Sequence, residues 1–141
     1  MKMHRRWLVV LLIAVLALGP SAVAVSSRQT ALLAAVNRHR VVSLEPDAGM
    51  MRRSQQHAQR MAEAEHLFHS RLRLPVDAVW AGEVIGVGKN IRVVVQAWLA
   101  SPEHRAIILR RQAHVAGAGV AEDDDGDLWM VVQVAQLEDT S

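Results

Sequence analysis

The sequence predicts an α+β domain in which helices pack on a small antiparallel sheet. Segments with apolar residues three and four positions apart, which is the period of a helix, alternate with shorter segments rich in β-branched residues. The chain ends in two β-rich runs, 114–121 and 128–137, on either side of an acidic stretch that contains Asp125-Gly126. An Asp-Gly pair between two such runs is typical of a hairpin. The expected order is helix, helix, strand, helix, helix, hairpin, which is an α+β pattern.

The first helix is expected to begin at Ser26 or Ser27. Either side chain can accept a hydrogen bond from the first turn of a helix and so cap it. Residues 41–44 then form a short extended stretch. We expect Glu45-Pro46 to end this stretch, because proline donates no backbone hydrogen bond.

A second helix is expected from Asp47, a good capping residue, to about Leu67. Its small and apolar residues recur at helical spacings and mark the side that faces the core. This stripe comprises Met50, Met51, Ser54, Ala58, Met61, Ala62 and Glu65.

Residues 70–79 are expected to form a loop, because Pro75 excludes a continued helix. A short strand is expected at 79–84, closed by Gly86 and Gly88.

Two further helices follow. Asn90 can cap the first of them, over 93–99. Pro102 fits the first turn of the second, which is expected to reach about Arg111. Ser101, directly before this proline, is typical of a helix cap, and the sequence therefore does not favour it as a nucleophile.

The first 24 residues have the three parts of a secretory signal peptide. Residues 1–6 are basic, residues 7–18 are an unbroken apolar run, and Ala22-Val23-Ala24 supplies small residues for cleavage. We expect cleavage after Ala24, which leaves one exported domain over 25–141. The alternative is an N-terminal membrane anchor, although about 12 apolar residues are short against the ~20 of a spanning helix.

Composition excludes several classes of function. The chain has no cysteine, and therefore no disulfide framework, thiolate metal site, cysteine nucleophile or lipoprotein anchor. Removal of Lys2, Arg5 and Arg6 with the signal leaves 13 basic against 14 acidic residues. The expected domain therefore has a formal charge of −1. It lacks the excess of positive charge that is typical of nucleic-acid-binding domains, and we expect no nucleic-acid partner.

Three titratable residues lie next to loops, glycines or helix ends, where chemistry is often found: His69, Glu83 and His104. If they meet in one cleft, two imidazoles and a carboxylate can hold zinc or another divalent cation with an open position. They can equally relay protons without a metal. A structural alternative is that the histidines satisfy backbone groups and that Glu83 pairs with an arginine.

Spacing along the chain does not show whether these three residues meet, but a resemblance to a known family bears on this question. Six fragments occur in the family's order along the expected domain: 33–40, 54–62, His69-Ser70, Gly82-Glu83, 98–109 and 115–120. In these fragments the chain resembles the CAP superfamily of cysteine-rich secretory proteins, antigen 5 and plant pathogenesis-related 1 proteins. It is most similar to the short bacterial SCP-like branch.

The resemblance implies an α-β-α sandwich with a polar cleft, which holds zinc or another divalent ion in some members. His69 matches the first cleft histidine, Glu83 the glutamate of the Gly-Glu-Asn motif, and His104 the second histidine. The chain departs from the family pattern at Val84, which replaces the asparagine, and at Glu103, which replaces a glycine. Ser101 stands where animal members carry a second acidic residue, so the cleft would hold a triad.

Fold does not select one function in this superfamily. We favour a non-enzymatic extracellular or cell-envelope binding module of a bacterium, whose cleft holds a small molecule, a lipid, an envelope component or a divalent ion. The alternative is a metal-assisted hydrolase in which Glu83 is the general base beside His69 and His104.

Overall fold

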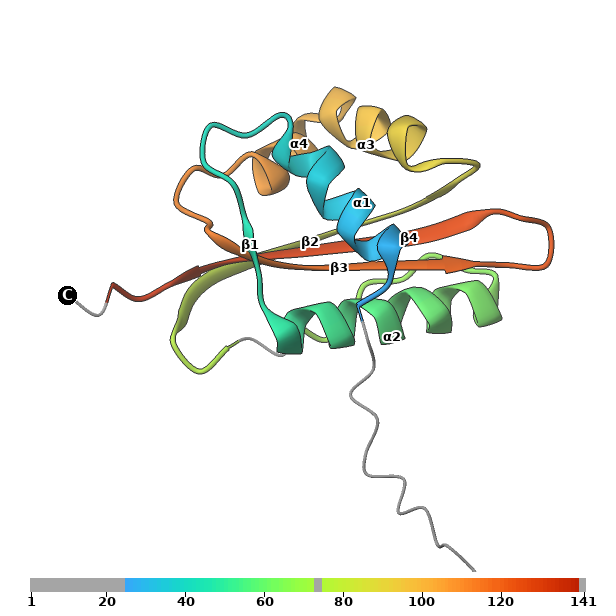
Figure 1. Cartoon of the computed structure of the whole chain (residues 1–141), viewed down its shortest axis with the longest axis horizontal. Coiled ribbons are helices and arrows are strands. Elements are labelled where there is room, and N and C mark those ends of the chain that lie inside the picture. Colours follow the sequence, from blue (N-terminus) through green and yellow to red (C-terminus); the bar gives the residue numbers. More distant parts are fainter. Residues whose placement is uncertain (1–24, 73–74, 140–141) are drawn as a thin grey trace, which may run out of the picture.

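The computed structural model describes residues 25–72 and 75–139, and the signal peptide predicted over 1–24 lies outside the described residues. Within these described residues the chain forms four helices and four strands in the expected α+β arrangement (Figure 1). In chain order they are α1 (Ser27–Asn37), β1 (Glu45–Pro46), α2 (Ala48–Ala64), β2 (Ala78–Gly88), α3 (Ile91–Ala100), α4 (Pro102–Ile108), β3 (Val115–Glu122) and β4 (Leu128–Leu137).

The four strands form one sheet in the order β1-β3-β4-β2. β2, β3 and β4 pair antiparallel, as the sequence predicts, and β3 and β4 form the predicted hairpin. The sheet is mixed, because the two-residue strand β1, which the sequence did not predict, pairs parallel to β3. Glu45 N–H donates to His114 O and Asp47 N–H donates to Ala116 O, so that Pro46 between them needs no donor at this edge.

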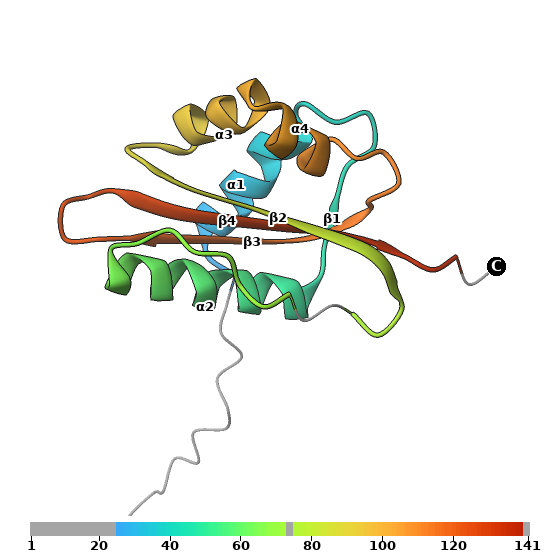
Figure 2. The ribbon, with the colours of Figure 1, turned by 180° about the vertical axis from the view of Figure 1, so that it is seen from behind.

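The domain has three layers, and the predicted α-β-α sandwich is confirmed. α2 covers one face of the sheet, and α1, α3 and α4 cover the other (Figures 1 and 2). Because side chains alternate between the faces of a strand, each strand contributes to two separate cores. On β4, Met130, Val132 and Val134 face the larger core, whereas Trp129 and Val131 pack with Ala58 and Met61 of α2.

The helix α2 lies unusually close to β3, and two glycines permit this approach. A Cβ atom at Gly117 would lie 2.3 Å from the Met50 carbonyl, and one at Gly119 would lie 2.1 Å from Ser54 O. Both neighbours are backbone atoms and cannot move aside as a side chain can. The two glycines therefore set the position of α2 on the sheet.

The helix starts agree with the sequence, and several ends do not. Side chains of Ser26, Asp47 and Asn90 each accept the expected capping hydrogen bond from the backbone. Helix α2 ends at Ala64, short of Leu67, because Glu65 adopts a left-handed conformation with φ of 49°.

Two other elements differ in length from the prediction. Helix α4 ends at Ile108, before Arg111. Strand β2 continues from Ala78 to Gly88 through the predicted terminators, because β4 pairs with it along that whole length.

No helix within 25–72 and 75–139 has both the length and the apolarity needed to cross a bilayer.

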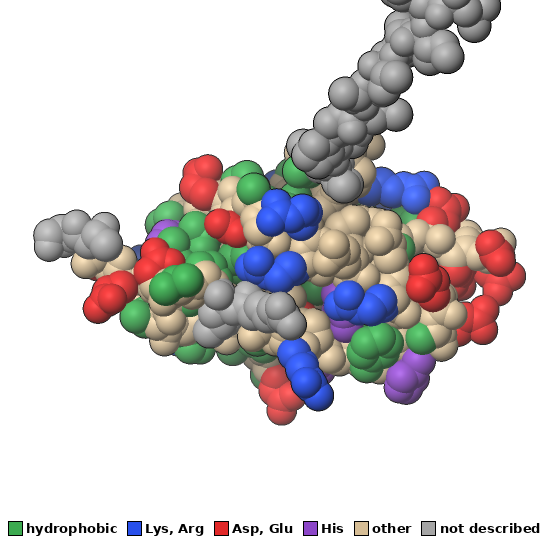
Figure 3. Space-filling model, turned by 90° about the horizontal axis from the view of Figure 1, so that it is seen from below, with side chains coloured by type: hydrophobic (Ala, Val, Ile, Leu, Met, Phe, Trp, Pro, Cys, Tyr) green, Lys and Arg blue, Asp and Glu red, His purple; other side chains and the backbone are tan. Residues whose placement is uncertain are grey.

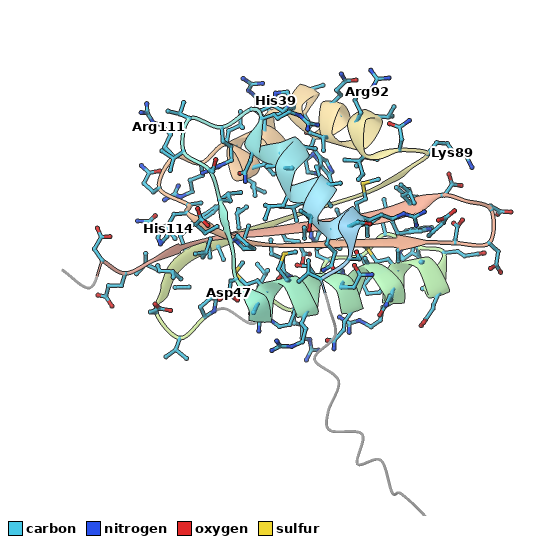
Figure 4. All side chains as sticks on the ribbon, in the orientation of Figure 1. His39, Asp47, Lys89, Arg92, Arg111 and His114 are labelled. Carbon is cyan, nitrogen blue, oxygen red and sulfur yellow. The ribbon has the colours of Figure 1, made fainter. Side chains whose placement is uncertain are left out.

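Figure 4 shows Asp47 at the start of α2, on the opposite side of the sheet from His39 and Arg92.

Candidate functional site

The polar centre of the domain lies on the sheet face that α2 covers. Glu83 on β2 pairs in register with Gln133 on β4, and both side chains point to this face. Their neighbours there, Ile85, Trp129 and Val131, are apolar and pack against α2. Only 2% of the Glu83 side chain is exposed, so this carboxylate depends on protein donors for its hydrogen bonds.

Four donors meet the Glu83 carboxylate. Its Oε1 accepts from the Ser70 backbone N–H at 2.9 Å and from His69 Nδ1 at 2.9 Å. Its Oε2 accepts from Gln133 Nε2 at 2.8 Å and from the Ser70 hydroxyl. The segment after α2 is thereby tied to two strands of the sheet.

The hydrogen bonds decide the ionisation of this carboxyl. Burial acts to raise the pKa of Glu83, but the donors Gln133, Ser70 and His69 together outweigh burial and hold the pKa below its ordinary value. Glu83 is therefore a carboxylate at neutral pH.

His69 stands between this buried carboxylate and solvent. The ionised Glu83 can only accept, so Nδ1 of His69 must carry the proton that joins them. The other ring nitrogen, Nε2, remains available, and 63% of the His69 side chain is exposed. The hydrogen bond to Glu83 therefore orients the imidazole ring and leaves Nε2 available to a ligand.

A second histidine, His57 on α2, supports the same segment from beneath. It is 1% exposed, and its Nε2 lies 2.6 Å from Phe68 O, to which it must donate. Its Nδ1 therefore accepts, and Arg60 lies 3.4 Å away as donor. The Phe68 ring packs edge-on against the imidazole with 5.0 Å between centroids.

The site also contains His57, Ser70 and Gln133, which were not predicted as site residues from the sequence. His57 is buried on α2 three residues after Ser54, and this helical spacing is the signal that could have placed it with the buried residues. Gln133 interrupts a continuous apolar run in β4, and a polar side chain at a buried strand position needs a partner.

A groove opens between α2 and the segment 68–71, and we call it the α2 groove. Its volume is about 540 Å³, within the range of small-molecule sites. It is lined by Arg53, Gln56, His57, Arg60, Phe68, His69, Ser70, Arg71 and Gln133.

The structure brings His69 and Glu83 together, but it does not bring His104 into contact with them. His104 lies on the first turn of α4, where its Nδ1 is 2.8 Å from the Ser101 hydroxyl. Ser101 precedes α4 as its N-cap residue, but its hydroxyl pairs with the His104 side chain and not with a backbone N–H of the helix. His104 lines a different, largely apolar pocket with Trp98 and Val87.

These positions do not make a metal centre as they stand. Both oxygens of Glu83 are occupied by donors, and a cation would have to displace them. Among the residues that the structure describes, no three His, Asp or Glu side chains are grouped to hold an ion.

Comparison with known proteins places this site in a family context. The family model described as "CAP: Cysteine-rich secretory protein family" matches residues 27–134. The sequence matches no curated protein.

Solved structures share the fold at low sequence identity. An outer surface protein from Borrelia burgdorferi superposes with a TM-score of 0.67 and 18% identity, over 77% of this chain and 92% of that one. An extracellular protein containing an SCP domain from Bacillus anthracis gives 0.62 and 21%, over 77% of this chain and 40% of that one. Venom allergen-like protein 4 of Schistosoma mansoni gives 0.63 and 12%, over 81% and 91%.

Proposed function

Since the chain belongs to the cysteine-rich secretory protein (CAP) family, we propose that it is an exported binding module whose ligand occupies the α2 groove. The predicted signal peptide over 1–24 supports export. Two proteins of similar structure are an outer surface protein and an extracellular protein of bacteria. An extracellular or cell-envelope location, with a small molecule, lipid or envelope component as ligand, is the proposal that these observations favour.

The observation that carries a binding role is the engagement of Glu83. A general base needs a lone pair within reach of the proton that it removes. Glu83 is buried, and each of its oxygens already accepts two hydrogen bonds, from Ser70, His69 and Gln133. The carboxylate therefore acts to hold the wall of the groove, which argues against the alternative of a hydrolase with Glu83 as base.

The groove itself has the mixed lining of a ligand site. Phe68 supplies an aromatic surface that is 36% exposed, and His69 presents a fixed nitrogen. The wall is preorganised, because His57 and Glu83 hold the backbone of residues 68–70 from two sides. Preorganisation lowers the entropy that binding must offset.

The experiment blocks the groove without touching its supports. Gln56 is exposed on α2 and lines the groove, whereas Gln59 is exposed on α2 and does not. The thermal midpoint of purified protein would be followed with phosphorylated, carboxylated, neutral-sugar and lipid components of bacterial envelopes. We expect at least one compound to stabilise wild type and the Gln59→Trp control, and to have no effect on Gln56→Trp.

Two results would overturn the proposal. One is equal stabilisation of both variants, which would place the ligand outside the groove. The other is chemical conversion of the bound compound, detected by mass spectrometry, which would restore the hydrolase hypothesis. The predicted metal site is tested separately, by metal analysis of wild type beside the double variant His69→Ala/His104→Ala.

A further inference from the structure

The α2 groove is lined by basic side chains. Three arginines and two histidines line it, and no acidic residue is among the described residues of its lining. Figure 3 views the face that carries α2 and shows basic side chains across its middle, with acidic side chains gathered toward both ends. The described lining therefore carries three positive charges, and the carboxylate in contact with it is the buried Glu83 behind His69, Ser70 and Gln133.

These arginines have no acidic partners in the part of the chain that the structure describes. The ion pairs found there join Arg28 to Glu122 and Lys89 to Asp127, and the carboxylate of Glu83 pairs with His69. The Nε–H of Arg53 is buried and has no acceptor. Arg60 makes one long contact of 3.4 Å to His57, and the Arg71 side chain is exposed. The groove thus offers many N–H donors and few acceptors.

The arginines come from both walls of the groove. Arg53 and Arg60 are two turns apart on α2, about 10 Å along the helix axis. Arg71 lies on the opposite wall, one residue after Ser70, whose position Glu83 fixes. Both walls therefore contribute guanidinium donors to the same groove.

From this geometry we propose that the α2 groove binds a small molecule through a phosphate group, and this inference rests on the binding function proposed above. A phosphate monoester carries about −1.5 to −2 charge at neutral pH and three acceptor oxygens. It can accept from guanidinium groups on two walls, whereas a carboxylate is satisfied by one bidentate arginine. The rest of the ligand would pack on Phe68, and His69 Nε2 would face it.

Inorganic phosphate is the first probe. We would measure its dissociation constant by thermal stabilisation of the purified protein at constant ionic strength, with acetate as the carboxylate comparison. Vesicles of phosphatidylcholine with and without phosphatidic acid distinguish a lipid headgroup from a soluble phosphate compound. We expect phosphate to bind at least about tenfold more tightly than acetate, given its extra charge-assisted hydrogen bonds.

The variants Arg60→Gln and Arg71→Gln each remove one donor group from the groove. Each is expected to weaken phosphate binding about tenfold or more. Arg52→Gln is the matched control, because Arg52 is exposed on the same helix and lies outside the groove lining. It removes the same charge and is expected to change the dissociation constant less than twofold. Arg71→Lys, which retains the charge, is expected to recover part of the affinity if the fold is intact.

The proposal is overturned if phosphate does not bind, if acetate binds equally well, or if Arg52→Gln weakens binding as much as the groove variants. The binding function is judged by a different result. A neutral ligand that is lost in Gln56→Trp and unaffected by Arg60→Gln and Arg71→Gln would refute the phosphate site alone. Absence of any ligand from the groove would refute both.

Discussion

Replacement of Glu83 by Gln removes the charge of the buried carboxylate while nearly preserving its shape. The Gln side chain keeps one acceptor oxygen and replaces the other by an NH₂ group, which donates. Two of the four donors that now reach the carboxylate, from His69, Ser70 and Gln133, then lose an acceptor. Hydrogen bonds to a charged group contribute about 1.5–3 kcal/mol each.

Two such losses would cost about 3–6 kcal/mol, and the Ser70 hydroxyl can rotate to accept, which favours the lower end. We therefore expect the free energy of unfolding at pH 7 to fall by about 3 kcal/mol. The assay is urea unfolding, supported by a decrease in the thermal midpoint of roughly 10 °C for a domain of this size.

The control is Glu103→Gln. Glu103 is an exposed carboxylate in the first turn of α4, and its loss should cost less than about 1 kcal/mol through the helix dipole. If Glu83→Gln is no more destabilising than this control, then Glu83 does not hold the groove wall. That result, combined with lost turnover of a substrate, is what the hydrolase hypothesis predicts.

Three further outcomes follow from the same contacts. The folded-state pKa of Glu83 is lowered, so the stability that this carboxylate contributes is complete above the ordinary carboxyl pKa and is lost as pH falls through the folded-state pKa. The urea midpoint of wild type should therefore fall more between pH 7 and pH 3 than the midpoint of Glu83→Gln. Parallel pH curves for the two proteins would contradict this. His57→Ala removes the donor to Phe68 O and should cost about 2 kcal/mol and accelerate amide exchange over 66–71, whereas unchanged exchange would mean that the segment is held elsewhere. Gly119→Ala places a Cβ atom 2.1 Å from the Ser54 carbonyl oxygen and should cost about 1–3 kcal/mol in urea unfolding, and a wild-type midpoint would show that α2 can move away freely.

Local signals in the sequence predicted the elements of the fold well. Ser26, Asp47 and Asn90 cap helices as expected, because a capping side chain acts on backbone groups within three residues. The hairpin around Gly126 was equally readable, since its turn requires the positive φ of 78° that glycine adopts without strain. These features depend on neighbours in the chain.

Element ends were predicted less well, because their causes are distant. Strand β2 passes through Gly86 and Gly88 since β4 pairs with it there, and a Cβ atom at Gly86 would lie 2.8 Å from Val94. These glycines lie where α3 packs closely on the strand, whereas the sequence pattern predicted that they end it. The end of α2 was also hard to predict, because the residue with the left-handed conformation there is Glu65 and not a glycine.

The sequence by itself determined the class of fold, the family, and two residues of the polar centre, His69 and Glu83. Only the tertiary structure decided their partners, because Gln133 lies 50 residues from Glu83 and reaches it through strand pairing. It also showed that His104 makes its hydrogen bond to Ser101 at the start of α4 and none to His69 or Glu83. Spacing along a chain specifies helices and turns, whereas the meeting of distant side chains depends on sheet register and on the face to which each strand residue points.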